Sequence, residues 1–192
     1  TYTFLDLKKG KHVLQGLEAL QFLRTRHGVG DGSDLSRISN QQVFLTSLIR
    51  KVRSDGVLTN PVKLYSLANA AVRNMTLSSS LADLGTMVAI GGALKNIPLE
   101  KITFLQVPSR GGLPAPYSGR VMPVYEKANV LFEKLANDEP LLIAKAQPGT
   151  GAVLATPAPT ATPSATPSPT ATEQYLDDTY RGTNGSQTTC SG

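Results

Sequence analysis

Apolar periodicity runs through roughly the first 145 residues of this chain and then stops. From Pro148 to Thr172 the composition is dominated by Pro, Ala, Thr and Ser. A segment with so little apolar bulk cannot offset the entropy lost on ordering, and its prolines favour an extended spacer. The sequence therefore predicts a folded part over residues 1–145, a Pro/Ala/Thr-rich linker over 146–173 and a polar disordered tail over 174–192. Tyr175, Leu176 and Tyr180 are candidates for a small docking patch in that tail.

Helical and strand patterns alternate within the folded part. The spacing of apolar residues predicts helices over 17–22, 35–52, 61–74, 80–94 and 125–137, and strands over 101–108 and 119–123. The second of these helices should turn an apolar face inward, made of Ile38, Val43, Phe44, Leu45, Leu48, Ile49 and Val52. We expect an α/β fold in three layers, with a mixed central sheet and helices on both of its faces.

The positive charge of the chain lies on the folded part. Residues 1–145 hold 18 Lys and Arg against 11 Asp and Glu, a net charge of +7, whereas the remainder holds one Arg and three acids, a net charge of −2. A basic surface suits nucleic acid, an anionic membrane face or a phosphorylated substrate. The sequence has no helix-turn-helix, zinc-finger or ribonucleoprotein motif and few aromatic residues, so we expect no nucleic-acid partner.

Three arginines and a glutamine stand close together in the sequence, at Arg24, Arg26, Arg37 and Gln41. If residues 23–26 are extended, the first two arginines point to the same side. Arg37 and Gln41 are four residues apart and share a helix face. Each guanidinium offers a planar fork that matches phosphate oxygens in pairs, so convergence of the three would suit a pyrophosphate. Spacing alone equally allows a solvated face with surface ion pairs.

The wider pattern resembles the LytR-CpsA-Psr family. The run from Gly10 to Leu20 resembles its Gly-x-x-x-Leu-x-Gly-x-x-Ala-Leu motif, followed by Arg-x-Arg at 24–26 and by an Asp-x-x-Arg segment that ends in Gln41-Gln42. The motifs occur in the family's order over roughly residues 1–140. One position departs from the family, because Asn40 stands where a further arginine is usual.

The resemblance implies a cell-wall glycopolymer ligase, a phosphotransferase that moves a polymer from a polyprenyl-pyrophosphate carrier onto peptidoglycan. Arg24, Arg26 and Arg37 would be catalytic and, with Gln41, would bind the pyrophosphate; Asp34, Gln42 and Arg110 would support them. Asp34 would orient an arginine or cap the following helix. Mg²⁺ is implied as cofactor, with ligands expected in an upstream half. A membrane helix is expected in that half too, which would hold the protein at the extracellular face of the membrane or in the cell wall. The fragment by itself is expected to be inactive.

Two other functions stay open. Loss of a charge at Asn40 allows a protein that binds polyprenyl pyrophosphate without turnover, and a regulator of envelope genes (a transcriptional attenuator) is the second. The residues favour neither a disulfide nor a metal site, because Cys190 is the only cysteine and the two histidines have no metal-binding spacing. No run of 18 apolar residues occurs, so none of the chain's own segments is predicted to span a membrane.

Overall fold

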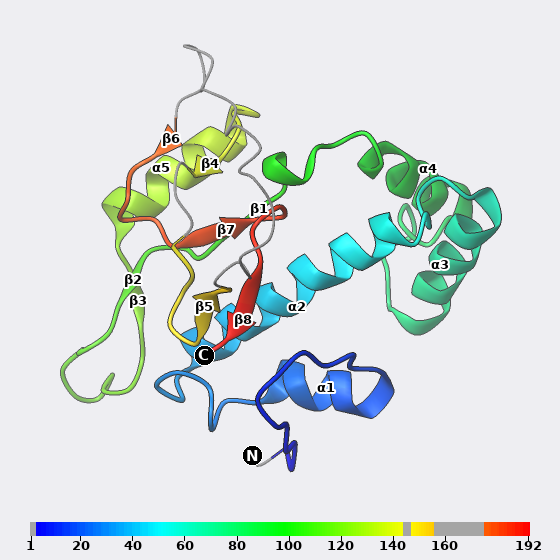
Figure 1. Cartoon of the computed structure of the whole chain (residues 1–192). Coiled ribbons are helices and arrows are strands. Elements are labelled where there is room, and N and C mark those ends of the chain that lie inside the picture. The colour runs from blue at the N-terminus through cyan, green and yellow to red at the C-terminus, as the bar shows by residue number, and fades with distance from the viewer. Residues whose placement is uncertain (1–2, 144–146, 156–174) are drawn as a thin grey trace, which may run out of the picture.

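The computed structural model describes residues 3–143, 147–155 and 175–192 (Figure 1). The helices in these ranges are α1 (Gly16–Arg24), α2 (Asp34–Ser54), α3 (Pro61–Asn74), α4 (Leu84–Leu94), a short 3-10 turn (Leu99–Lys101) and α5 (Tyr125–Ala136). The strands are β1 (Thr103–Leu105), β2 (Ser109–Arg110), β3 (Met122–Pro123), β4 (Leu142–Ile143), β5 (Ala152–Leu154), β6 (Tyr175–Leu176), β7 (Gly182–Asn184) and β8 (Thr189–Ser191). The chain thus mixes helices and strands, which confirms the predicted α/β class.

Three helices begin at a polar N-cap. The Ser33 hydroxyl accepts from the Ser36 amide, Asn60 accepts from two amides of α3, and Asp83 accepts from the Thr86 amide. Each cap satisfies backbone donors that have no partner within the helix. The cap at Asp83 also corrects a predicted boundary, because α4 begins at Leu84 and not at Ser80.

The expected single central sheet is not what the described residues form. They make four two-stranded sheets, β1–β7, β2–β3 and β5–β8 antiparallel and β4–β6 parallel. The strands are only two or three residues long, and among the described residues no sheet has more than two strands. The helices pack chiefly on one another and on these short ladders (Figure 1).

The prediction of a disordered tail over 174–192 is wrong for its described residues. Three of the four sheets take one strand from this C-terminal segment, which we define as residues 175–192. Leu176 and Tyr180 are buried with Leu131 of α5 and Ile143 of β4 in one apolar cluster. The Tyr180 hydroxyl also donates to the Lys127 carbonyl, 3.2 Å away. The predicted docking patch therefore docks on the chain's own α5, and only Tyr175 of the three stays exposed.

The pairing of the C-terminal segment also involves part of the predicted linker. Within the predicted linker, Ala152–Leu154 forms β5 against β8, and Gln147 bridges to Gly182. Residues 156–173 lie outside the described ranges. Residues 147–155 form a strand and a bridge because they pair with residues far along the chain. Local composition does not indicate such partners.

The buried face of α2 differs from the predicted apolar face. Its buried residues are Ser36, Ser39, Asn40, Val43 and Thr46, whereas the predicted Ile38, Leu45 and Leu48 are exposed. A close backbone approach explains the small polar residues. A Cβ added at Gly149 would lie 2.2 Å from the Ser39 hydroxyl, and one at Gly151 would lie 2.9 Å from the Ser36 Cβ. Larger side chains on this face would not fit.

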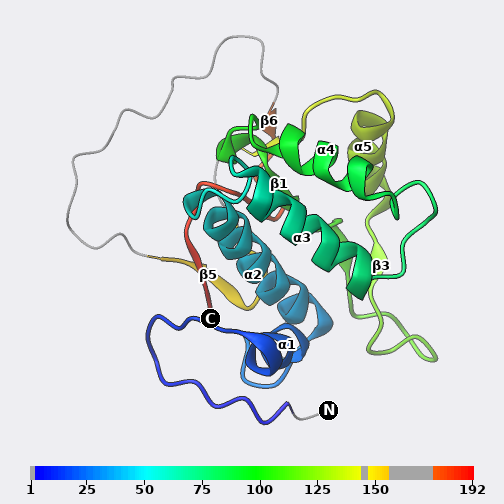
Figure 2. The same ribbon diagram turned by 90° about the vertical axis from the view of Figure 1, so that its right-hand side faces the viewer.

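Helix α2 is the element around which the others are arranged. Figures 1 and 2 both show α1 against its N-terminal half, while β5 and β8 pack on it and α3 pairs with α4 near its C-terminal end. Arg50 of α2 binds the C-terminal segment, because its Nε donates a hydrogen bond to the Gly185 carbonyl at 2.8 Å. Within the described ranges, no helix has the length and apolar character needed to cross a membrane.

Candidate anion-binding site

Asp34 brings two of the predicted arginines together. One of its carboxylate oxygens lies 3.2 Å from Arg26 Nε and 2.9 Å from Arg37 Nη2. Asp34 is the first residue of α2, Arg37 follows one turn later, and Arg26 comes from the loop after α1. We call these three residues the arginine cluster. Two roles were predicted for Asp34, orienting an arginine and capping the helix. In the structure Asp34 contacts two arginines, and Ser33 provides the helix cap.

The arginine cluster keeps donors that its own ion pairs do not use. Arg37 Nε is buried and has no hydrogen-bond partner among the described residues. A buried donor without a partner costs free energy, which an incoming oxygen would recover. The cluster also stands at the N-terminus of α2, where the helix dipole favours an anion. Both ion pairs are exposed, as the predicted alternative of surface ion pairs has it, so the anion site stays a prediction.

Arg24 lies nearby but in a different conformation from the one predicted. It is the last residue of α1, so residues 23 and 24 are helical and only the chain from Thr25 onward is extended. Leucine and arginine are good helix formers, which lets α1 continue past the predicted end at Phe22. The Arg24 side chain is exposed and makes no ion pair or hydrogen bond with the described residues. The expected alignment of Arg24 with Arg26 on one strand is wrong.

Gln41 and Asn40 are both tied to the end of α1. Gln41 Nε2 donates to the Leu23 carbonyl at 3.1 Å, and Asn40 Nδ2 donates to the Phe22 carbonyl at 2.9 Å. The amide nitrogen of Gln41 is therefore already engaged with the backbone. Its predicted role as a pyrophosphate ligand stays a prediction, and the structure gives it a second role in joining α1 to α2.

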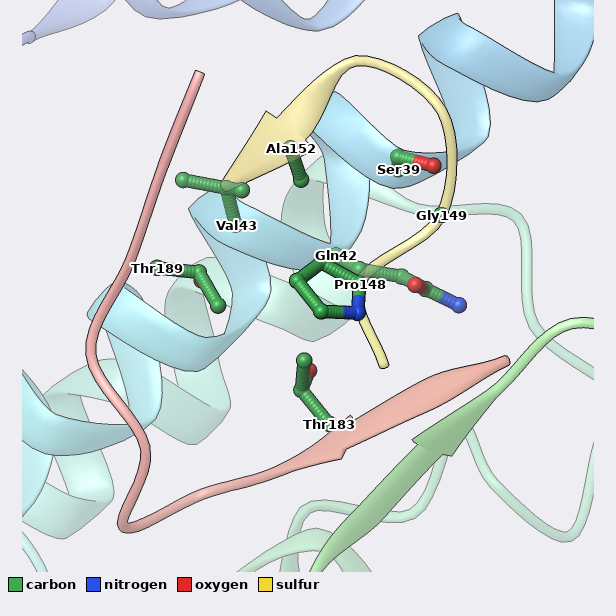
Figure 3. Close-up of a pocket in the computed structure, with 8 residues that line it drawn as sticks. All are labelled: Ser39, Gln42, Val43, Pro148, Gly149, Ala152, Thr183 and Thr189. Atoms are coloured by element: carbon green, nitrogen blue, oxygen red, sulfur yellow. The ribbon is translucent and has the colours of Figure 1, made fainter. Parts of the chain in front are cut away.

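The other two predicted supporting residues lie apart from the arginine cluster. Gln42 faces the C-terminal segment and lines a shallow pocket with Ser39, Pro148 and Thr183 (Figure 3). That pocket is too narrow to hold a water molecule, so we assign it no ligand. Arg110 is exposed in β2, where it pairs with Met122 of β3, and no described hydrogen bond or ion pair joins it to the cluster.

The loop between Arg26 and Asp34 is shaped by contacts of Gly30 and Asp31. Asp31 accepts hydrogen bonds from Ser33 and Ser36, and these bonds hold the pKa of its carboxyl down at about 2. Gly30 has a φ of +50°, and a Cβ there would lie 2.7 Å from the Gly151 backbone. The Gly30 amide donates to the Gly192 carbonyl at 3.2 Å. The two contacts of Gly30 join segments more than a hundred residues apart, so the local sequence carried no signal for them.

The arginine cluster does not fit a divalent metal. Its one carboxylate is paired with two arginines, and no three His, Cys, Asp or Glu side chains gather anywhere in the described residues. Mg²⁺ takes several oxygen ligands in near-octahedral geometry. We therefore derive no step that passes through a metal at this site.

Comparison with known proteins supports the motif assignment. The model of the LytR_cpsA_psr family matches residues 1–132. The chain belongs to the LytR_cpsA_psr family. It is 35% identical over 99 residues to the "Cell wall biosynthesis protein LcpA" of Corynebacterium glutamicum, a match that covers 52% of this chain and 18% of that protein. The chain thus spans about a fifth of the length of this curated relative. No solved structure matches the present chain.

Proposed function

We propose that this member of the LytR_cpsA_psr family takes part in building the cell wall by transferring a glycopolymer from a polyprenyl-pyrophosphate carrier to peptidoglycan. The observation that carries the proposal is the convergence of Arg26 and Arg37 on Asp34, beside an unpartnered buried donor. Family membership and the relative's name in cell wall biosynthesis support the same direction.

The charge of the site matches that of the proposed ligand. Three arginines (Arg24, Arg26 and Arg37) and the one carboxylate of Asp34 leave a net charge of +2. A pyrophosphate esterified at both ends carries two negative charges at neutral pH. Arginine forks bind such oxygens in pairs, and their charge does not change with pH in the physiological range. Asp34 keeps the guanidinium groups oriented before the ligand arrives.

The proposed reaction displaces one phosphate from another. The oxygen of an acceptor hydroxyl bonds to the phosphorus next to the polymer, and the bond from that phosphorus to the bridging oxygen breaks. Polyprenyl phosphate leaves with the electron pair, and the hydroxyl proton passes to a base. Negative charge grows on the leaving phosphate during this step. The arginines would stabilise it electrostatically, without supplying a nucleophile or a proton.

Other parts of the proposed enzyme lie beyond these residues. The proposal includes Mg²⁺ as cofactor, a membrane anchor and a place at the outer face of the membrane or in the wall. The described residues supply neither metal ligands nor a membrane-spanning helix, so these elements carry no part of the argument made from this structure.

A thermal-shift titration with a polyprenyl pyrophosphate tests the proposal. At a ligand concentration of one hundred times Kd, binding to the folded state should stabilise it by about 2.7 kcal/mol. The Arg26→Ala and Arg37→Ala variants should lose most of this shift. Arg73→Ala is a matched control, because Arg73 is exposed on α3, where its side chain donates a hydrogen bond to Asn69 of the same helix.

Transfer of labelled polymer to peptidoglycan then separates catalysis from binding. In a protein that includes the expected upstream half, binding without transfer would support the non-catalytic alternative. The absence of any shift in a parent that melts cooperatively would overturn the proposed ligand, and an equal loss in Arg73→Ala would show a general effect of charge.

A further inference from the structure

The last turn of α1 is held by side chains from outside its own backbone ladder. The Thr25 hydroxyl donates to the Gln21 carbonyl at 2.8 Å, Asn40 donates to Phe22, and Gln41 donates to Leu23. The final carbonyls of a helix have no partner within the helix, and without caps the terminal turn frays. Three consecutive carbonyls, those of Gln21, Phe22 and Leu23, are therefore satisfied. They stand just before the chain leaves the helix after Arg24.

Asn40 is the buried member of this set. Its exposed fraction is 0%, and it lies on the inward face of α2 with Ser36 and Ser39. A side chain without solvent access cannot point at an anion on the surface, so Asn40 does not substitute for an arginine in the arginine cluster. Its amide nitrogen is spent on Phe22, and its Oδ1 has no partner in the described residues. Among the described residues, the hydrogen bond of this buried side chain is therefore the one that joins it to α1.

We propose that Asn40 is a positioning residue, which fixes the Arg24–Arg26 segment against α2 by capping the Phe22 carbonyl. Arg26 thereby reaches Asp34, and Arg24 is carried on a terminal turn that stays closed. The inference rests on the proposed function, because the positioned side chains are those assigned to the pyrophosphate. It also changes how the departure from the family pattern is interpreted. Asn40 acts on α1, so the absence of an arginine at this position does not weaken the site.

Hydrogen exchange at the Thr25 amide tests the positioning directly. This amide donates to the same Phe22 carbonyl, at 3.3 Å, so its exchange reports opening of the terminal turn. Asn40→Ser should suit the serine-rich buried face of α2 but is too short to reach Phe22. Loss of one hydrogen bond predicts that Thr25 exchanges roughly fivefold faster in the folded protein. Asn40→Ala, which also lacks the donor and adds no charge, provides a second variant if Asn40→Ser folds poorly.

Thr46→Val is the matched control. Thr46 is equally buried on the same face of α2, but its hydroxyl bonds to Gln42 within the helix and touches no carbonyl of α1. We expect this variant to lose global stability while Thr25 exchange and the Kd for farnesyl pyrophosphate stay unchanged. In Asn40→Ser, measured well below its melting temperature, that Kd should also rise, because Arg26 is no longer held against α2.

The outcomes distinguish failure of the inference from failure of the proposed function. If the parent binds farnesyl pyrophosphate and Thr25 exchange is unchanged in both Asn40 variants, the inference is overturned and the function stands. If Thr46→Val weakens binding as much as Asn40→Ser, the role of Asn40 is purely structural and the inference is again overturned. A parent that binds no pyrophosphate overturns the proposed function and the inference together, even if the turn opens as expected.

Discussion

The junction between α1 and α2 and the C-terminal segment are built on opposite principles. At the junction, polar side chains from residues within about twenty positions of one another meet through ion pairs and amide caps. The C-terminal segment instead contributes strands and two buried apolar side chains to partners 30 to 80 residues away. The first region has a recognisable sequence motif, whereas the second has none and yet contributes part of the core. A recognisable sequence motif and a contribution to the core are therefore found in different regions of this chain.

The largest expected effect tests whether the C-terminal segment is a true part of the core. Leu176→Ala should lower the free energy of unfolding by about 2–5 kcal/mol, because it empties space beside Leu131 and Ile143. Leu154→Ala is the control, since Leu154 is exposed and its change should stay within about 0.5 kcal/mol. Urea unfolding measures both. Equal, small effects would return the segment to the predicted disordered tail.

A second substitution tests the junction from the inside. Asn40→Arg should destabilise the protein by about 1–3 kcal/mol through overpacking, with a further cost for the buried charge, and should not tighten pyrophosphate binding. Ser47→Arg places the same side chain on the exposed side of α2 and should be nearly neutral. Melting curves and ligand titrations decide the matter. Tighter binding by Asn40→Arg would show that residue 40 faces the anion after all.

Breaking the ion pairs of the junction should affect stability much less. Asp34 is 56% exposed, so Asp34→Asn should cost less than about 1 kcal/mol, and the cost should shrink at high salt. Asp55→Asn, which removes the exposed pair with Lys51, is a reference of similar size. Chemical unfolding at low and high ionic strength provides the comparison. A loss of several kcal/mol would mean that the arginine cluster supports the fold as well as the ligand.

The smallest effect is a titration. The pKa of Asp31 is lowered from 3.8 to about 2 by hydrogen bonds from Ser33 and Ser36. Because the folded pKa lies below the unfolded one, the stabilisation is present in full above about pH 4 and is lost as the pH falls through about 2. Carboxyl NMR shifts should show the low midpoint, and Ser36→Ala should raise it. A midpoint near 4 in the parent would rule out this hydrogen-bonded loop.

Local signals predicted the helices better than their inward faces. Ser33, Asn60 and Asp83 cap helices close to where turn chemistry and periodicity placed them. The face of α2 was mispredicted because glycine-rich backbone from residues 149–151 packs against Ser36 and Ser39, and close approach excludes the apolar residues that periodicity favoured. In the candidate site, Arg26 and Arg37 both pair with Asp34, which the spacing allowed as surface ion pairs, whereas Arg24 is helical and Arg110 lies in β2.

The sequence by itself determined the α/β class, the approximate helices, the arginine motif and, through that motif, the family. These depend on interactions within a few residues or on a pattern retained for its chemistry. Only the tertiary structure decided that the C-terminal segment completes three sheets, that Asn40 caps α1 and that Gly30 meets Gly192. Such contacts join residues far apart in the chain, and their free energy depends on shape and burial that no local window of sequence contains.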